Sequence, residues 1–376
     1  MMELLGRSRE ELRRECRALG EPAYRGDQIY RALYREKKFA LADMSNLPRA
    51  FREKLAQAAV VTLPRVKHKY LSEDGSVRYL LEMEPSDSRA VESGNPDEPS
   101  TDSPKRPAAI EAVYMPSEGR RTVCISTQAG CAVDCQFCLT AQLGLIRNLT
   151  AAEILGQVLL PLAEARTGGE NRDPIQTNVV LMGQGEPLLN FDAVMAALQI
   201  LLDPEGAGLS AKHVTLSTSG IVPGIEKLSK ETVRPKLAIS LNASSDEQRD
   251  RLMPINRKYP LGKLMEACRN YPLRNWEHLT FEYVMLGGVN DSAEDARRVV
   301  RLLSPLASVK VNLIPWNPGQ LPFRESAAKT VEQFRKILVE RGVPAFVRYS
   351  RGRDVMAACG QLALQEVRNN PLAVIA

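Results

Sequence analysis

The chain lacks three features, each of which would have pointed to a particular class of protein. No apolar run approaches the roughly 18–20 residues needed to cross a bilayer. The N-terminus, MMELLGRSREELRREC, contains no apolar stretch of the kind found in secretory signals. The three histidines, His68, His213 and His278, are scattered and show no spacing typical of a nucleophile with its base. We therefore expect a cytoplasmic protein with no membrane contact, in which the histidines are structural.

Composition favours a globular chain with a mildly basic surface. Hydrophobic residues make up 44% and charged residues 25% of the 376 residues, which is enough apolar content for a core. The net charge is +5, and residues 1–60 hold 13 Lys and Arg against 9 Asp and Glu. That excess fits an RNA-binding module, but it equally fits solvated helix surfaces. A reducing cytoplasm would keep the seven cysteines out of structural disulfides, and Cys16 and Cys268 lie in apolar helical patterns typical of a core.

The first third of the chain predicts helices followed by a hairpin. Residues 1–60 have helical periodicity, and Ser8 with Glu11 has the spacing of a capping box. Residues 66–84 predict two strands joined by a turn at Asp-Gly. Residues 85–108 are rich in Pro, Ser and Asp, which is typical of a flexible, disordered insertion.

From about residue 120 the pattern alternates between strands and helices. The candidate strands are TVCIS, TNVVLMG, HVTLSTS, KLAISLN, LTFEYVML and VKVNLIPW, with FVRYS as a candidate seventh. Helices are expected between them, for example at 150–166 and 293–303. Six β–α units predict an α/β fold with a parallel sheet. The sheet is either open and doubly wound, or curved into a full or partial barrel. In both arrangements, ligands bind at the carboxyl ends of the strands.

Three cysteines lie within eight residues, in the segment Cys131-Ala-Val-Asp-Cys135-Gln-Phe-Cys138. Unlinked core cysteines rarely have this spacing, which favours a metal or cluster site. Structural zinc takes four ligands, usually as two close pairs; Cys124 is a candidate fourth, but no second Cys-x-x-Cys follows. A cubane iron–sulfur cluster usually takes four cysteines, so three would leave one iron open for a ligand. Zinc and a cluster both remain open on these residues alone.

The spacing Cys-x3-Cys-x-aromatic-Cys, with Phe137 as the aromatic residue, resembles the signature of the radical S-adenosylmethionine superfamily. That resemblance implies one 4Fe–4S cluster on Cys131, Cys135 and Cys138, whose fourth iron binds S-adenosylmethionine and splits it to a 5′-deoxyadenosyl radical. It also implies a partial (β/α)6-type barrel with a helical N-terminal domain and a β-hairpin extension. The expected division is a helical basic domain at 1–60, a hairpin extension at 61–116, a core barrel at 117–350 and a C-terminal tail at 351–376.

A longer ordered set of motifs resembles one family within that superfamily. The motifs are CISTQAGCAVDCQFCLTAQLGLIRNLTAAEI, LMGQGEPLLN, VTLSTSG, LAISLNA, NLIPWNP and RYSRGRDVMAACGQL. Together they resemble the RlmN family, which methylates C2 of adenine in 23S rRNA and tRNA. The resemblance implies those two RNA partners, two S-adenosylmethionine molecules per turnover, an electron donor such as flavodoxin and a monomer. The alternatives are a related enzyme that methylates C8, a zinc-bearing RNA-binding module, and a radical enzyme acting on a small molecule.

The GQGEP segment, residues 183–187, lacks the third glycine of a dinucleotide loop, and Glu186 would repel a pyrophosphate. A carboxylate at a strand end suits a ligand ammonium better. By resemblance, Gly185 and Glu186 contact the methionyl amino end of S-adenosylmethionine. The resemblance also implies that five further residues surround its ribose, adenine and carboxylate: Ser217, Ser240, Leu241, Asn242 and Asn317. Family members commonly have His where Asn242 stands and Met where Gln184 stands.

Two cysteines and one glutamate acquire roles only through the resemblance. From composition alone, Cys124 and Cys359 would be buried small residues and Glu111 an exposed strand residue. The family pattern implies that Cys359 carries a methyl group, that Cys124 releases the product through a transient disulfide bond, and that Glu111 accepts a proton. The chemistry needs such a carrier, because C2 of adenine is electron-poor and cannot attack a methyl sulfonium, whereas a thiolate can.

Overall fold

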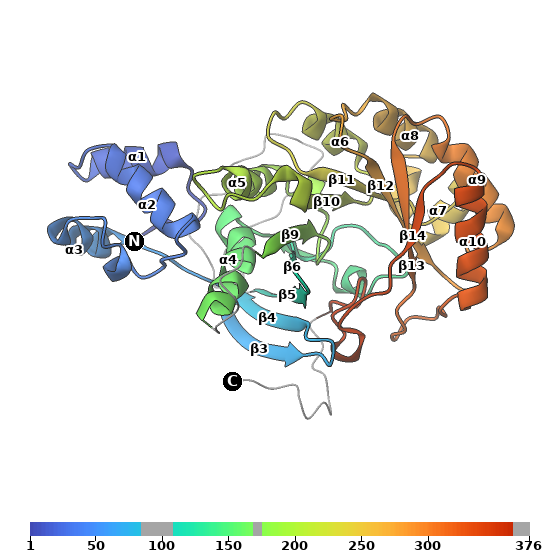
Figure 1. Cartoon of the computed structure of the whole chain (residues 1–376), viewed down its shortest axis with the longest axis horizontal. Helices are drawn as coiled ribbons and strands as arrows, with labels where there is room; N and C mark the ends of the chain where they lie inside the picture. The colour runs from blue at the N-terminus through green and yellow to red at the C-terminus, as the bar shows by residue number, and fades with distance from the viewer. Residues whose placement is uncertain (84–107, 168–174, 364–376) are drawn as a thin grey trace.

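A computed structural model of the chain describes residues 1–83, 108–167 and 175–363 (Figure 1). The predicted insertion at 85–108, apart from its last residue, lies outside the described residues, as do residues 364–376 of the predicted tail. Within the described ranges, no helix is both long and apolar enough to span a bilayer.

The N-terminal segment forms a helical lobe beside the main body (Figure 1). Its helices are α1 (Arg9–Ala18), α2 (Tyr24–Tyr34) and α3 (Arg49–Ala58). The predicted capping box at the start of α1 is present: Ser8 Oγ accepts from the Glu11 backbone, and the Glu11 carboxylate accepts from the Ser8 backbone. Two-residue strands, β1 (Met2–Glu3) and β2 (Ala59–Val60), pair in parallel and bring the two ends of the lobe together.

The first two helices of the lobe cross at Gly26. A methyl group added at this glycine would lie 2.4 Å from the backbone nitrogen of Arg13. Because that atom belongs to helix backbone, it cannot rotate away as a flexible side chain would. The absence of a side chain at Gly26 therefore sets the distance between α1 and α2.

Ten strands of the described chain form one mixed sheet, in the order β14-β13-β12-β11-β10-β9-β6-β5-β4-β3. The strands are β3 (Arg65–Leu71), β4 (Val77–Met83), β5 (Ala108–Ser117), β6 (Arg120–Cys124), β9 (Gln176–Leu181), β10 (Val214–Thr218), β11 (Lys236–Ser240), β12 (Leu279–Met285), β13 (Val309–Pro315) and β14 (Ala345–Val347). Those from β6 to β14 are parallel, whereas β3, β4 and β5 add an antiparallel extension. The predicted hairpin and the predicted strands of the alternating region are confirmed.

The parallel strands follow one another in chain order, which decides between the two closures. The crossover helices are α4 (Ala151–Thr167), α5 (Phe191–Leu202), α6 (Val222–Ser229), α7 (Asp246–Leu252), α8 (Leu261–Asn270), α9 (Ala293–Leu303) and α10 (Ala328–Glu340). A doubly wound sheet requires a reversal of strand order, and this sheet has none. Right-handed crossovers in constant order place the helices on one face. The fold is the expected partial barrel, with β14 and β3 as its open edges.

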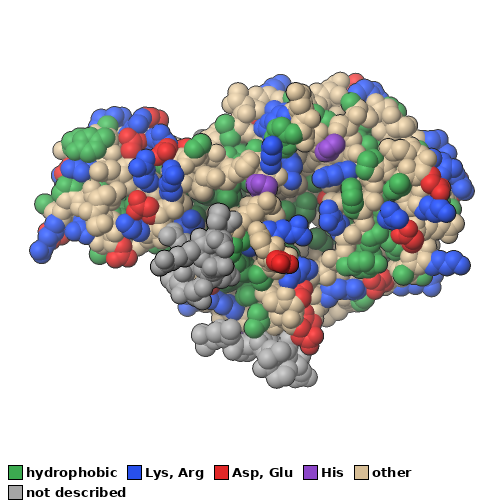
Figure 2. Space-filling model, viewed as in Figure 1, with side chains coloured by type: hydrophobic (Ala, Val, Ile, Leu, Met, Phe, Trp, Pro, Cys, Tyr) green, Lys and Arg blue, Asp and Glu red, His purple; other side chains and the backbone are tan. Residues whose placement is uncertain are grey.

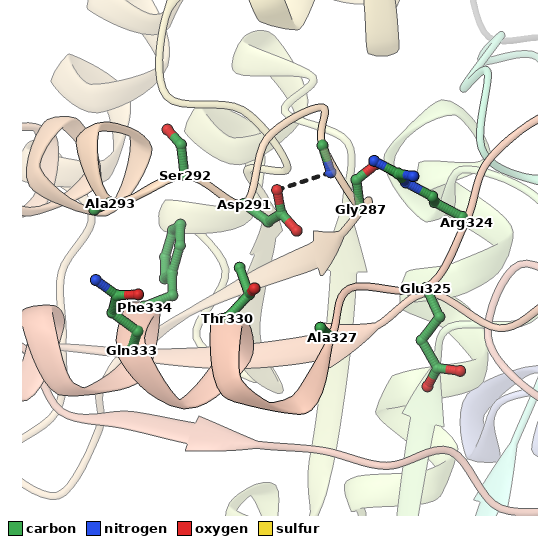
Figure 3. A pocket seen from close by; sticks show the side chains of 11 residues that line it. Gly287, Asp291, Ser292, Ala293, Arg324, Glu325, Ala327, Thr330, Gln333 and Phe334 are labelled. Atoms are coloured by element: carbon green, nitrogen blue, oxygen red, sulfur yellow. Dashed lines mark hydrogen bonds between the residues drawn. The ribbon is translucent and has the colours of Figure 1, made fainter.

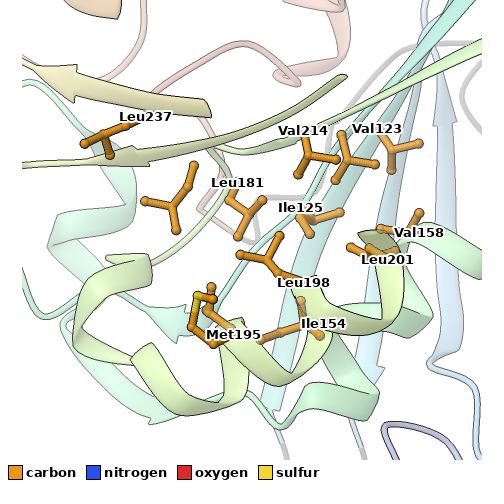
Figure 4. Close-up of a cluster of buried hydrophobic side chains, with 14 of the residues drawn as sticks. Val123, Ile125, Ile154, Val158, Leu181, Met195, Leu198, Leu201, Val214 and Leu237 are labelled. Carbon is orange, nitrogen blue, oxygen red and sulfur yellow. The ribbon is translucent and has the colours of Figure 1, made fainter. Parts of the chain in front are cut away.

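Alternate residues of the strands divide between two environments. One set packs against the helices in the main core and includes Val214, Leu216, Leu237, Ile239, Phe281 and Tyr283. Figure 4 shows part of this contact, with strand side chains against Ile154 and Val158 of α4 and Leu198 of α5. The intervening residues point to the other face of the sheet and include Thr215, Ser217, Ser240, Glu282 and Asn312. The concave side of the partial barrel is therefore polar.

The close approach at Gly26 leads to a stability prediction. Gly26→Ala should destabilise the chain by about 1–3 kcal/mol, because overpacked helices must separate. Gly262→Ala in α8 is the matched control: nothing lies within 4 Å of the added methyl, so it should be neutral or stabilise by up to about 1 kcal/mol. Urea unfolding followed by circular dichroism measures both. Equal stability of the two variants would contradict the packing argument.

Candidate active site

The loop that carries the three clustered cysteines begins after a short strand whose last residue must be glycine. β7 (Gln128–Gly130) pairs with β8 (Leu145–Asn148), and the Cys131 backbone donates to the Gly144 carbonyl at 3.0 Å. Gly130 has a φ of +73°, and a side chain there would lie 1.8 Å from that carbonyl oxygen. The cysteine loop therefore leaves the sheet along a path fixed by backbone contacts.

Cys131, Cys135 and Cys138 are partly exposed free thiols, close enough for their charges to interact. The surrounding protein removes much of their hydration, which raises the pKa of Cys131 to about 12 and that of Cys135 well above its usual range. Within the described ranges, no three His, Cys, Asp or Glu side chains converge on the position of a single metal ion. A cubane cluster has a different requirement, one thiolate at each of several irons, and three neighbouring thiols on one loop fit it.

The GQGEP segment follows β9 and lies against the cysteine loop. Gly183 has no space for a side chain, because an added methyl would lie 2.7 Å from Ser126 Oγ. Gly185 has a φ of +99°, and a methyl group added to it would collide with Gln128. Its backbone N–H donates toward the Cys131 thiol. The structure thus brings together two motifs that lie about 50 positions apart in the chain.

Glu186 is a buried carboxylate held by short hydrogen bonds. Ser219 donates to Oε2 from both its backbone and its hydroxyl at 2.7 Å, and the Leu188 backbone donates to Oε1 at 3.0 Å. Burial raises the pKa of Glu186, and these donors oppose that rise. The negative charge of Glu186 also raises the pKa of Cys131, although burial has a larger effect. A cationic group of a ligand placed here would meet a carboxylate that is already oriented.

The residues matched to the ribose, adenine and carboxylate lie at strand ends along the same edge. Ser217 is in β10, Ser240 ends β11, and Leu241 and Asn242 follow directly. The Asn242 side chain is used within the protein: Oδ1 accepts from the Val284 backbone at 2.8 Å and Nδ2 donates to Met253 Sδ at 3.3 Å. Any ligand contact at Asn242 is therefore expected from its backbone, which has a φ of +55°.

The loop around Cys359 is fixed from two sides by backbone carbonyl contacts. Leu139, directly after the cysteine loop, donates from its backbone to the Gly360 carbonyl at 2.8 Å. Thr140 donates from Oγ1 to the Leu362 carbonyl at 2.6 Å. Asn317, after β13, donates from Nδ2 to the Cys359 carbonyl at 3.2 Å. The Asn317 side chain, which the family resemblance placed at the cofactor, therefore uses its amide nitrogen to hold the Cys359 loop.

A third anchor comes from the hairpin turn between β3 and β4. The Gly352 backbone donates to Asp74 Oδ2 at 2.9 Å, and Ser72 Oγ donates to Asp354 Oδ1 at 2.5 Å. Burial would raise the pKa of Asp74, but hydrogen bonds from Ser76 and Gly352 hold it below its usual range. The antiparallel extension of the sheet thus carries the segment that leads to Cys359.

Cys124 and Cys359 are neighbours on the concave side of the sheet. Cys124 ends β6 and packs with Val355, Ala357 and Leu362 of the C-terminal segment. Burial and then the charge of Cys359 raise the pKa of Cys124. Solvent reaches Cys359, yet lost hydration and then the charges of Glu282 and Cys138 raise its pKa to about 12. Both are free thiols in this structure, so the expected disulfide bond is not seen.

Glu111 is fully buried rather than exposed on its strand. It forms an ion pair with Arg78, which is also fully buried and lies under the ring of Tyr70 at 4.2 Å. Gln184 Nε2 is 3.4 Å from Glu111 Oε2, and Ser126 Oγ donates to the Glu111 carbonyl at 2.7 Å. The register places Arg78 opposite Val113 and Val113 opposite Cys124, so these groups share the concave face.

Several polar groups near these residues were missed by the sequence analysis. Glu282 is buried in β12 and accepts a hydrogen bond from Asn312 Nδ2 at 2.9 Å. Its negative charge raises the pKa of Cys359. Burial raises the pKa of Glu282 itself. A charged residue within the apolar run LTFEYVML was a signal available in the sequence. Arg78, in the apolar run VRYLLEM, carries the same signal, whereas Arg249 is a fully buried charge without one.

A cavity of about 500 Å³ lies away from these groups, between the starts of α9 and α10 (Figure 3). Asp291 at its wall accepts from the Gly288 backbone at 2.9 Å and from Ser326 Oγ at 2.7 Å. Arg324 donates to the Gly287 carbonyl at 3.1 Å. None of the site residues expected from the sequence lines this cavity, so its shape contributes nothing to the assignment of the site.

Much of the positive charge of residues 1–60 is paired. Figure 2 shows basic and acidic side chains intermixed on the N-terminal lobe. The residues in ion pairs are Arg7, Arg9, Arg13, Arg31, Arg35, Lys38 and Arg49. Arg9, Arg31 and Arg35 bind Asp203 and Glu205, in the segment after α5, so they attach the lobe to the barrel. The lobe therefore presents less positive charge to a partner than its composition indicates.

Comparisons with known proteins agree with this geometry. Residues 125–302 match the radical SAM superfamily, and residues 2–61 match the ribosomal RNA large subunit methyltransferase N-terminal domain. The chain is 47% identical over 359 residues to a probable dual-specificity RNA methyltransferase RlmN of Koribacter versatilis, covering 93% of this chain and 98% of that relative. It is 46% identical to the dual-specificity RNA methyltransferase RlmN of an Anaeromyxobacter species, covering 96% of this chain and 90% of that relative.

A solved structure extends the agreement to the fold. The crystal structure of a radical SAM methyltransferase from Sphaerobacter thermophilus superposes with a TM-score of 0.84 at 40% identity, covering 96% of this chain and 99% of that one. With these relatives matched over nearly their whole length, the chain belongs to the RlmN family of radical S-adenosylmethionine RNA methyltransferases.

Proposed function

We propose that this chain methylates C2 of adenine in 23S rRNA and in tRNA, with Cys359 as the methyl carrier. The observation that carries the proposal is the placement of the Cys359 loop: Ala357 and Leu362 pack with Cys124, and the Gly360 carbonyl accepts from the backbone of Leu139, next to Cys138. A methyl carrier must meet both the groups that load and activate its methyl and the thiol that later releases the product. The names of the RlmN relatives support an RNA substrate.

Cys131, Cys135 and Cys138 are proposed to bind the 4Fe–4S cluster that membership of the superfamily implies, together with S-adenosylmethionine. When bound, the cluster would supply the one electron that splits S-adenosylmethionine to a radical, and a separate S-adenosylmethionine molecule would supply the methyl group. Glu186 would receive the methionyl ammonium, because it is a buried carboxylate oriented by Ser219. The strand ends of β10 and β11 would bind the nucleoside part through Ser217, Ser240, Leu241 and Asn242.

Cys359 would act first: its sulfur accepts a methyl group, and the thiol proton, which the raised pKa retains at neutral pH, must leave in the same step. After hydrogen is removed from that methyl, its carbon bonds to C2 of the base. Cys124 would then attack the Cys359 sulfur, so that a sulfur–sulfur bond forms while the sulfur–carbon bond to the product breaks. The released carbon would take a proton to become the methyl group, and the one electron left over from the radical adduct would return to the cluster. A thiol reductant must reduce this transient disulfide before the next turnover.

Glu111 would accept the C2 proton that must leave before the ring is aromatic again. The Arg78 guanidinium beside it favours the ionised carboxylate, which is the form that accepts a proton. Burial would keep water from competing for this step. We further propose that the enzyme acts as a monomer in the cytoplasm and takes electrons from a small carrier such as flavodoxin.

Product analysis tests the regiochemistry. Anaerobic incubation with 23S rRNA and tRNA fragments, followed by nucleoside mass analysis, should detect 2-methyladenosine from both RNAs. Standards of 2-methyladenosine and 8-methyladenosine separate the two isomers chromatographically. Accumulation of the 8-methyl isomer would overturn the C2 assignment, and product from only one RNA would overturn the dual substrate.

The cluster assignment predicts a sharp difference among the cysteines. Cys131→Ala, Cys135→Ala or Cys138→Ala should each abolish S-adenosylmethionine cleavage and remove the visible colour, because each thiolate binds one iron. Cys16→Ala and Cys268→Ala are controls: both thiols are buried and free, so these variants should keep iron while losing some stability. Iron and labile sulfide analysis with visible spectra decides. A full cluster in any of the first three variants would contradict the assignment.

The two remaining cysteines should fail at different steps. Cys359→Ala should carry no added methyl by mass spectrometry and form no bond to RNA. Cys124→Ala should load the methyl and add to C2 but not release, leaving a protein–RNA band that survives denaturation. If both were packing residues, each variant would lose modest stability and still make product. Normal turnover by Cys124→Ala, or methylated RNA from Cys359→Ala, would end the methyl-carrier proposal.

A further inference from the structure

Arg249, in α7, is a fully buried arginine whose hydrogen-bond partners are all neutral. Its Nε donates to the Leu241 carbonyl at 3.1 Å and its Nη1 to Asn256 Oδ1 at 3.1 Å. Its Nη2 donates to the Ser219 carbonyl at 2.6 Å and to the Ser240 carbonyl at 3.1 Å. A buried guanidinium usually has an acidic partner in direct contact, because burying an unpaired charge is costly.

The segment that carries Arg249 packs against the cysteine loop. The Gln136 backbone donates to the Leu252 carbonyl, at the end of α7, at 3.0 Å. Leu252 and Met253 lie in one apolar cluster with Phe137, Cys135 and Cys138. Arg249 lies three residues before Leu252 in the same helix, so its charge lies on the α7 side of the cysteine loop.

Electrostatics agree with this placement. Burial lowers the pKa of Arg249 to about 10, so the group remains charged at neutral pH, and Cys135 is the strongest charge opposing that shift. Asp246 and Asp250 are weaker influences.

We propose that Arg249 is a positioning residue with two effects: its fixed positive charge behind Cys135 makes the cluster easier to reduce, and its hydrogen bonds join the loops that follow β10 and β11. The first effect rests on the proposed function, because it requires the cluster to be bound by Cys135. One electron arriving from an external carrier adds negative charge to the cluster, and a nearby cation stabilises that state. Because Arg249 is buried, dissolved salt screens its effect on the cluster only weakly.

The second effect links the residue that orients Glu186 to the expected nucleoside site. Ser219 orients Glu186, and Ser240 and Leu241 lie at the end of β11. Gly220 leaves the space that the guanidinium occupies, since an added methyl would lie 3.3 Å from Nη2. One side chain thus holds the segments at the ends of β10 and β11 at a fixed distance from each other.

The test compares two substitutions that separate charge from hydrogen bonding. In Arg249→Gln the charge is lost; in Arg249→Lys the charge stays but the planar fork is lost. Holoenzyme is prepared anaerobically, iron and sulfide are counted, and the cluster is titrated against potential by electron paramagnetic resonance without S-adenosylmethionine. We expect Arg249→Gln to show an about tenfold lower ratio of reduced to oxidised cluster at a fixed potential, equivalent to about 59 mV for one electron. Arg249→Lys should stay within about twofold of the parent ratio but melt at lower temperature.

Arg234→Gln is the matched control. Arg234 is also buried, but it precedes β11, at the opposite end of the strand from Ser240, and it donates to the Pro272 carbonyl. Its loss should lower stability and leave the potential unchanged. An Arg249→Gln cluster with the parent potential, or an Arg249→Lys cluster shifted as far as Arg249→Gln, would overturn the proposal.

A variant of opposite sign covers the case in which Arg249→Gln does not fold. Asp250 accepts from Asn256 Nδ2 at 2.7 Å and partly offsets the Arg249 charge. Asp250→Asn can retain that hydrogen bond and should raise the potential; an unchanged or lower potential would overturn the charge effect. Failure of the cluster assignment itself is distinguishable, because Cys135→Ala would then keep a full cluster.

Discussion

Seven parallel strands that follow one another in chain order end along a single edge of the sheet, and the candidate site depends on this constraint. Each right-handed crossover returns the chain to the far end, so every loop after a strand reaches the same side. Glu186, Ser217, Ser240, Asn242 and Asn317 are spread over more than 130 positions of the sequence, yet they lie at this edge. The cysteine loop then needs only to leave the first parallel strand on the same side.

Alternation along the strands supplies the second condition for chemistry. Apolar residues such as Leu216 and Phe281 face the helices, whereas Ser217 and Glu282 face the concave side. A barrel filled by branched apolar side chains would leave no room for a ligand. Here the concave side is polar, and the C-terminal segment with Cys359 covers part of it through Val355 and Ala357.

Features with a local signal were predictable from the sequence. The strands and helices followed from periodicity, and the start of α1 followed from the capping box at Ser8. The spacing of the three cysteines indicated a candidate metal or cluster site. Features that depend on distant partners were not. Nothing near Glu111 in sequence announces a buried pair with Arg78, and nothing near Asn317 announces its bond to the Cys359 carbonyl 42 positions later. Such pairings can be predicted only once the three-dimensional arrangement of the strands and loops is known.

The hairpin turn at Asp74 has a consequence for how the chain tolerates changes in length. β4 runs away from this turn, and the long connection of residues 84–107 joins the far end of β4 to β5. The Cys359 segment is tied to the turn itself, through Gly352 and Asp354. Residues can therefore be gained or lost in the connection without moving the turn, since the ladder of β4 with β5 lies between them. The position of Cys359 therefore does not depend on the length of the connection at residues 84–107.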